Sequence, residues 1–120
     1  NWVNKKENRA KLEDNEKNYR VIASNIRAYL ESDEKVLISC DSLSEKTTIF
    51  INKLQTYLPD IQIVCKGSIL NSSETINELK NCENVILLLE CNKSTYKSII
   101  DEKEKLKDLE KNLLGSIVIE

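Results

Sequence analysis

The sequence of 120 residues contains no histidine and no methionine, and only two glycines and one proline. Without histidine, the chain lacks the side chain that most often acts as a general base or a metal ligand near neutral pH. No apolar run is long enough for a transmembrane helix, and no segment has the pattern of a signal peptide. The first residue is Asn1, so we expect the sequence to be a fragment of a longer protein.

The charged residues are nearly balanced between the two signs. There are 18 Lys and Arg residues against 20 Asp and Glu residues, which gives a formal net charge of −2. Proteins that bind nucleic acids usually carry a basic excess or a basic stripe, so we expect no nucleic-acid partner. Forty per cent of the residues are hydrophobic, which is enough for the core of one domain.

The four cysteines occur singly, without a C-x-x-C pair: Cys40, Cys65, Cys82 and Cys91. Their spacing fits neither a zinc site nor the disulfide framework of a small secreted protein. Cysteine is among the residue types most often found buried. We therefore predict reduced, buried cysteines in a cytosolic protein, with no bound metal.

Two regions differ in composition. Residues 1–14 are mostly polar and are predicted to be a linker or a helical extension, whereas residues 15–120 are predicted to be a single α/β domain. A helix is expected over residues 15–31, because apolar residues recur there at spacings of three and four. These residues are Tyr19, Ile22, Ala23, Ile26, Tyr29 and Leu30.

Four short runs rich in apolar and β-branched residues predict strands. They are Lys35–Cys40, Ile61–Lys66, Asn84–Glu90 and Ser116–Glu120, the last following a turn at Gly115. Helices are expected between them, capped by Ser44, by Ser72 or Ser73, and by Ser94, and ending near residues 58, 81 and 112. Apolar strands that alternate with helices predict a three-layer αβα fold with a parallel sheet. The dense charges of the last helix are interpreted as a solvated face.

The loop after the first of these strands approaches a phosphate-binding motif. A P-loop has the pattern G-x-x-x-x-G-K-[ST], in which the lysine contacts phosphates and the hydroxyl binds Mg²⁺. Lys46 and Thr47 occupy the last two positions, but Asp41 and Glu45 replace the two glycines. Glu45 adds a side chain where the backbone must bend and a negative charge where a polyanion would lie. The motif therefore predicts a poor nucleotide site.

Several segments together resemble a known family. They are residues 19–26 (YRVIASNI), 39–48 (SCDSLSEKTT), 62–70 (QIVCKGSIL), 83–94 (ENVILLLECNKS) and 114–119 (LGSIVI). In this order they are similar to the bacterial tyrosine kinase (BY-kinase) domains and to the cytoplasmic domains of polysaccharide co-polymerases. The resemblance implies a truncated P-loop NTPase-like fold with a four-stranded parallel sheet in the order 2-1-3-4. It also implies an N-terminal helix with interface candidates Tyr19, Arg20, Ile22 and Ile26.

The departures from the family pattern all affect the chemistry. The aspartate that would order Mg²⁺ falls on Cys65, and the segment with the catalytic aspartate has no counterpart. The interface motif E-x-x-R-x-x-R falls on Lys17, Arg20 and Ala23, so that only Arg20 matches. We therefore expect no catalytic residue and no cofactor, with Lys46 and Thr47 as vestigial P-loop positions.

The resulting hypothesis is a non-catalytic, vestigial kinase-like domain of bacterial capsular, exopolysaccharide or lipopolysaccharide biosynthesis, acting in chain-length determination. Its expected partners are proteins: a second copy, or a polysaccharide-synthesis kinase or co-polymerase. It would lie at the cytoplasmic face of the plasma membrane, held by segments outside this chain, with Lys5, Lys6 and Arg9 near the membrane. One alternative is a flavodoxin-like or receiver-like regulatory module, although no acidic pair accompanies Asp41 in the sequence. An active P-loop kinase with a divergent loop is the other alternative.

Overall fold

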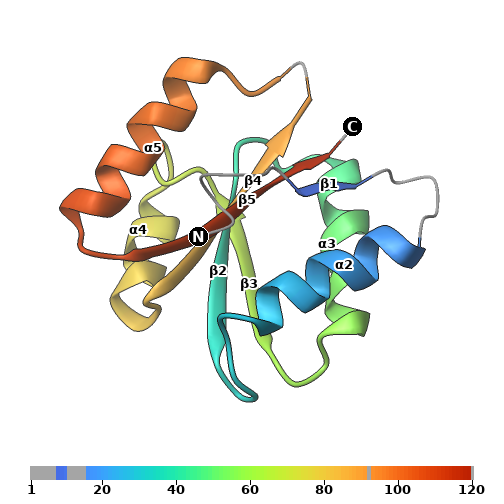
Figure 1. The fold of residues 1–120 in the computed structure, drawn as a ribbon. Helices are drawn as coiled ribbons and strands as arrows, with labels where there is room; N and C mark the ends of the chain where they lie inside the picture. The colour runs from blue at the N-terminus through green and yellow to red at the C-terminus, as the bar shows by residue number, and fades with distance from the viewer. Residues whose placement is uncertain (1–7, 11–15, 92, 120) are drawn as a thin grey trace.

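The fold is an αβα sandwich around one parallel sheet (Figure 1). The computed structural model describes residues 8–10, 16–91 and 93–119. In chain order the elements are β1 (Asn8–Ala10), α2 (Glu16–Arg27), β2 (Lys35–Cys40), α3 (Glu45–Tyr57), β3 (Gln62–Gly67), α4 (Ser73–Glu78), the 3₁₀ turn η1 (Leu79–Asn81), β4 (Asn84–Glu90), α5 (Tyr96–Asp108) and β5 (Asn112–Ile119). The strand order is β1-β5-β4-β2-β3, and every pairing is parallel.

The predicted order of the four main strands is confirmed. Counted along the chain from β2, they lie in the order 2-1-3-4, so that β3 is an edge strand and β4 is interior. Residues 85–89 of β4 are all buried, as expected for a strand covered on both faces, and Gln62 is exposed where β3 begins. Helices α2 and α3 cover one face of the sheet, and α4, η1 and α5 cover the other (Figure 1).

The N-terminal region contributes a strand that the sequence pattern did not indicate. Residues 8–10 were expected in a linker or a helical extension, but they form β1 and pair with Ile117, Val118 and Ile119 of β5. The expected order 2-1-3-4 makes β5 an edge strand, whereas β1 covers part of its outer edge. Such pairing uses backbone groups, so a three-residue polar segment can join a sheet without an apolar pattern. The other residues of 1–14, including Lys5 and Lys6, lie outside the described residues.

Several predicted helix ends are confirmed and others are wrong. Ser44 caps α3 and Ser72 caps α4, each accepting a hydrogen bond from a backbone N–H three residues later. Helix α5 is capped by Thr95, whose Oγ1 accepts from the N–H of Ser98 at 3.1 Å. Ser94, the expected cap, instead accepts from the backbone N–H of Glu90 at 3.2 Å.

The end of α5 also differs from the prediction. The helix stops at Asp108 and not near residue 112, and Glu110 follows with a left-handed φ of 56°. The strand β5 then begins at Asn112, four residues earlier than expected. Gly115 lies within this strand and not at a turn, beside a register shift that leaves Leu114 without a partner on β4.

Candidate functional site

The loops at the carboxyl ends of β2, β3 and β4 form one edge of the sheet, and we refer to it as the carboxyl edge. Their described residues are 41–44, 68–72, 91 and 93–95, and each loop leads into a helix. In parallel α/β sheets this edge is where ligands usually bind, because helix N-termini and loop side chains meet there. The vestigial P-loop positions lie at this edge, so it is the candidate site.

A carboxylate of the same chain lies at the N-terminus of α3. The hydroxyl of Ser44 accepts from the N–H of Thr47 at 3.3 Å and donates to Oε1 of Glu90. Oε2 of Glu90 lies 3.0 Å from Nζ of Lys93. The hydrogen bond from Ser44 lowers the pKa of Glu90, helped by Lys93 and opposed by burial. Glu90 is therefore an anion near neutral pH, close to the helix terminus where a P-loop protein holds a phosphate.

The two vestigial P-loop residues, Lys46 and Thr47, lie in different environments. Lys46 is exposed in the first turn of α3. Thr47 is 1% exposed, and its hydroxyl donates to the carbonyl oxygen of Ser44 at 2.7 Å. A P-loop threonine must present this hydroxyl to Mg²⁺, but here it is buried and already bonded within the helix cap.

An acidic pair lies at the same edge, formed by Asp41 after β2 and Glu102 in α5. Glu102 is 0% exposed, and the four carboxyl oxygens of the pair lack a hydrogen-bond partner among the described residues. Burial raises the pKa of Glu102 to about 9, with a further contribution from the neighbouring Asp41 carboxyl and an opposite one from the Ser68 hydroxyl. Glu102 is thus protonated near neutral pH, and its proton can be donated to Asp41.

Sequence reasoning missed this pair. The charged residues of α5 were all interpreted as a solvated face, and that is wrong for Glu102. The spacing contained the necessary information, because Ile99, Glu102 and Leu106 recur at three and four residues and so share one helix face. The opposite case is Tyr96, a large apolar residue at the start of the same helix that is 80% exposed.

The interface candidates on α2 do not form one exposed surface. Tyr19, Ile22 and Ile26 are at most 1% exposed and belong to the core beneath α2 and α3. The Tyr19 ring stacks on Phe50 and Tyr57, with centroid distances of 5.4 and 5.7 Å. These three residues are therefore part of the domain's own core, because the apolar face of α2 packs on α3. Of the four candidates, Arg20 is exposed, and it pairs with Glu16 at 2.6 Å.

The four cysteines differ in exposure. Cys40 and Cys82 are buried as predicted, Cys65 is half-buried, and Cys91 is exposed, contrary to the prediction, because it lies just beyond the end of β4. All four are free thiols. Cys65 lies in β3 beside β2, where the resemblance places the Mg²⁺-ordering aspartate. A thiol in this position provides no hard oxygen ligand for Mg²⁺.

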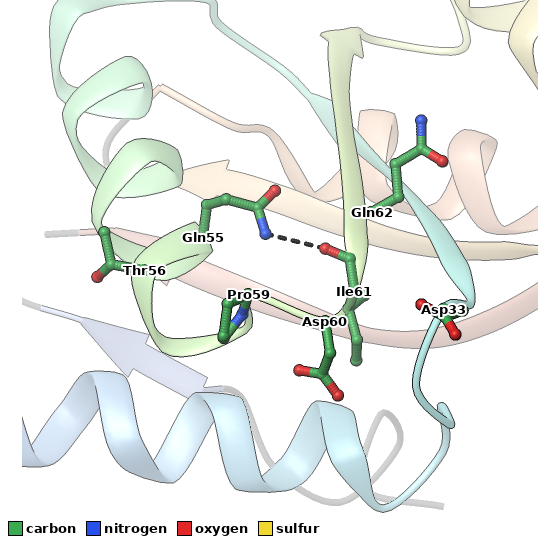
Figure 2. A pocket seen from close by; sticks show the side chains of 7 residues that line it. All are labelled: Asp33, Gln55, Thr56, Pro59, Asp60, Ile61 and Gln62. Carbon is green, nitrogen blue, oxygen red and sulfur yellow. Dashed lines mark hydrogen bonds between the residues drawn. The ribbon is translucent and has the colours of Figure 1, made fainter.

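A hollow of about 550 Å³ lies at the opposite, amino edge of the sheet, where α3 turns into β3 (Figure 2). Its polar groups are engaged in holding the turn. Gln55 donates to the carbonyl oxygens of Leu58 and Ile61 at 2.7 and 2.9 Å. Asp60 accepts from Arg27 at 2.6 and 2.8 Å and from the hydroxyl of Ser32 at 2.8 Å. These contacts assign the hollow a structural role, so it is not the candidate site.

Neither the residues nor the comparisons assign a ligand. In the described parts of the chain, no three or more Cys, Asp or Glu side chains are grouped so that they could hold a metal ion. The helices of these parts are also too short or too polar to cross a membrane. No family model matches the chain, and no curated protein or solved structure matches it either.

Proposed function

We propose that this chain is a non-catalytic, kinase-like interaction domain of bacterial polysaccharide biosynthesis, in the determination of chain length. The observation that carries the non-catalytic part is the Glu90 carboxylate bonded to Ser44 at the N-terminus of α3. A nucleotide phosphate in this place would meet a buried anion, and the nearby Asp41 and Glu102 add further carboxyl groups. The buried hydroxyl of Thr47 also leaves no P-loop ligand for Mg²⁺.

The link to polysaccharide synthesis depends on the resemblance to BY-kinase and co-polymerase domains, and the strand order is consistent with it. The observed order of β3, β2, β4 and β5 is the order that this resemblance implies. A domain of this kind would lie at the cytoplasmic face of the membrane and contact a second copy, a kinase or a co-polymerase. Membrane attachment would come from segments outside this chain.

Exposed apolar side chains at the carboxyl edge support a protein partner over a nucleotide. Leu43, in the loop before α3, is 63% exposed, and Tyr96, at the start of α5, is 80% exposed. Large apolar side chains contribute to protein interfaces, whereas a polyphosphate is recognised by charge and backbone N–H groups. We expect Leu43→Ser and Tyr96→Ser to weaken binding to the partner about tenfold or more. Val21→Ser on α2, at a residue 49% exposed and away from this edge, is the control.

Thermal melting with Mg-ATP and Mg-ADP tests the non-catalytic part. A functional site with a Kd of about 10 μM would stabilise the fold by roughly 2.7 kcal/mol at about 1 mM nucleotide. This corresponds to a rise in Tm of about 8–16 °C. We expect a shift within about 1 °C for the natural chain and for Lys46→Ala. A rise of several degrees that disappears in Lys46→Ala would contradict the proposal and favour an active P-loop kinase.

A second candidate function, a receiver-like regulatory module, is favoured by the acidic pair. The sequence showed no acidic partner for Asp41, but Glu102 lies beside it in the fold. A receiver-like module needs an acidic cluster and a phosphoacceptor aspartate after a strand, and Asp41 follows β2. Melting in Mg²⁺ with beryllium fluoride, a phosphoryl analogue, separates the candidates. A rise in Tm that Asp41→Asn abolishes would favour the receiver-like module, and no rise would favour the interaction domain.

A further inference from the structure

The thiols of Cys40 and Cys65 lie in contact between two adjacent strands. Their Sγ atoms are 2.8 Å apart, with Cys40 at the end of β2 and Cys65 in the edge strand β3. The strands are in parallel register, with Ile38 opposite Cys65 and Cys40 opposite Gly67. Both thiols are on the side of the sheet that faces α2 and α3. An S–S bond is about 2.05 Å long, so the two sulfur atoms would have to approach further. Because Cys40 is offset by two residues from the position opposite Cys65, the ends of the two strands would also have to shift toward each other.

The two thiols differ in reactivity. Cys65 is half-buried, whereas Cys40 is 1% exposed. Contact with the Cys40 thiol lowers the pKa of Cys65, an effect that burial opposes and Lys66 supports. The same contact, together with burial, raises the pKa of Cys40. Cys65 is thus the more exposed sulfur and the better thiolate, with Cys40 placed to react with it.

The other two cysteines make a useful comparison. Cys82 has its sulfur 3.2 Å from the carbonyl oxygen of Asn84 and 3.6 Å from that of Lys35, and no thiol contact is recorded for it within the described residues. Cys91 is exposed beyond the end of β4. Of the four cysteines, Cys40 and Cys65 are therefore the pair whose geometry fits an intramolecular disulfide.

We infer that Cys40 and Cys65 form a reversible redox pair, in which the Cys65 thiolate attacks hydrogen peroxide and Cys40 is the resolving thiol. The Cys65 thiolate takes one oxygen from hydrogen peroxide, becoming a sulfenic acid and releasing hydroxide. The Cys40 sulfur then attacks the Cys65 sulfur, the S–O bond breaks, and water leaves with the proton of Cys40. Two thiols and one peroxide thus give one disulfide and two waters, and an external dithiol reverses the reaction.

The disulfide would connect the strands that lead into the candidate site. Cys40 is followed directly by Asp41, and Cys65 is followed two residues later by Gly67, above which Leu43 lies. The bond would therefore hold the loops after β2 and β3 against each other, whichever partner binds there. This inference is independent of the proposed function, because it depends only on the two thiols.

Peptide mapping of the folded chain tests the inference. The protein is prepared as Cys91→Ser to remove the exposed thiol, treated with hydrogen peroxide, alkylated with N-ethylmaleimide and digested with trypsin without reduction. We expect peptide 36–46 to be joined to peptide 54–66, with the loss of two hydrogen atoms. Peptide 81–93, which contains Cys82, should carry the alkyl group. Dithiothreitol should restore both separate peptides.

Two controls make the result decisive. The linkage should form at least about tenfold faster in the folded chain than in urea, because the fold places the sulfurs together. The oxidised form should melt about 10 °C higher than the reduced form, and Cys65→Ser should abolish both the linkage and this shift. The inference would be overturned if Cys65 were oxidised further without forming the linkage to Cys40. It would also be overturned if the linkage formed only in urea, or if no reaction occurred. Cys40→Ala provides a second variant if Cys65→Ser does not fold.

Discussion

The two edges of the sheet differ in how their polar side chains are hydrogen-bonded. At the amino edge, Asp60 is bonded to Arg27 and Ser32, and Gln55 bonds the backbone of the turn that joins α3 to β3. At the carboxyl edge, the buried carboxyl groups of Asp41 and Glu102 lie beside each other, and their bond depends on the proton that Glu102 can donate to Asp41. A hollow of about 550 Å³ lies at the amino edge, whereas the buried acidic pair lies at the carboxyl edge.

This contrast distinguishes polar groups that stabilise the fold from polar groups that mark a candidate functional site. A polar group that is bonded to a basic side chain or to the backbone stabilises its turn, whereas burying two carboxyl groups side by side costs free energy that the rest of the fold must offset. Such costs are usually found where a protein acts on something else. The carboxyl edge is therefore the better candidate site. Three sets of variants test the contrast, from the largest expected effect to the smallest.

Glu102→Gln should stabilise the fold by about 3 kcal/mol at pH 7. Burial beside Asp41 raises the pKa of Glu102 to about 9, from an ordinary value of 4.5 in the unfolded chain. Between these two values the folded state holds a proton that the unfolded state has released, so raising the pH favours unfolding. The natural chain should therefore lose stability relative to the variant as the pH rises from about 4.5 to about 9. Urea unfolding at several pH values measures this difference.

Glu104→Gln is the matched control for that experiment, because Glu104 is two residues away on α5 and exposed. It removes the same charge without a buried carboxyl group, so its stability should follow that of the natural chain at every pH. If the difference in stability between Glu102→Gln and the natural chain did not change with pH, Glu102 would not be protonated in the folded state as inferred.

Ser44→Ala should destabilise the fold by about 2 kcal/mol. The variant loses the cap of α3 and also a hydrogen bond to Glu90, which is 4% exposed. Ser72→Ala removes a similar cap from α4, where no carboxylate is bonded, and should cost about 1 kcal/mol. Equal losses in the two variants, measured by urea unfolding, would mean that the bond to Glu90 contributes nothing.

Gln55→Ala should destabilise the fold by about 1–2 kcal/mol without changing any property of the carboxyl edge. The side chain bonds the backbone at Leu58, Ile61 and Ile63, and these groups would lose their partner. Gln62→Ala changes another residue that lines the same hollow (Figure 2) but is exposed, and should change stability by less than about 0.5 kcal/mol. If Gln55→Ala changed binding to the partner while the fold stayed intact, the hollow at the amino edge would have a functional role and not only a structural one.

Much of the fold could be predicted because its main elements have strong local patterns. The strands β2, β3 and β4 are short apolar runs between charges, and the spacing of Phe50 and Leu54 marks the buried face of α3. The order of the strands is not a local property, and its prediction depended on the resemblance to a family. The position of the candidate site followed from the same prediction, because parallel strands bring their carboxyl ends to one edge.

The features that were missed depend on tertiary contacts. Strand β1 has no apolar pattern and is defined by its backbone pairing with β5. Ser94 and Thr95 are both good caps, and the choice between them depends on the hydrogen bond that the Ser94 hydroxyl accepts from the backbone N–H of Glu90 at the end of β4. Glu102 looks like its charged neighbours in the sequence, and only the packing of α5 on the sheet separates it from them. The pairing of Cys40 with Cys65 likewise depends on strand register.

The pairing of β1 with β5 has a consequence for the order of folding. Asn8 lies opposite Ile117, so this contact joins residues more than 100 positions apart, and the strand that receives β1 is the last to be synthesised. Contacts of such high sequence separation carry a large loop-closure entropy and form late. A strand of three residues at an edge also opens easily once formed. Amide hydrogen exchange should therefore be fastest, among the strands, for residues 8–10 and slowest for the interior strand β4.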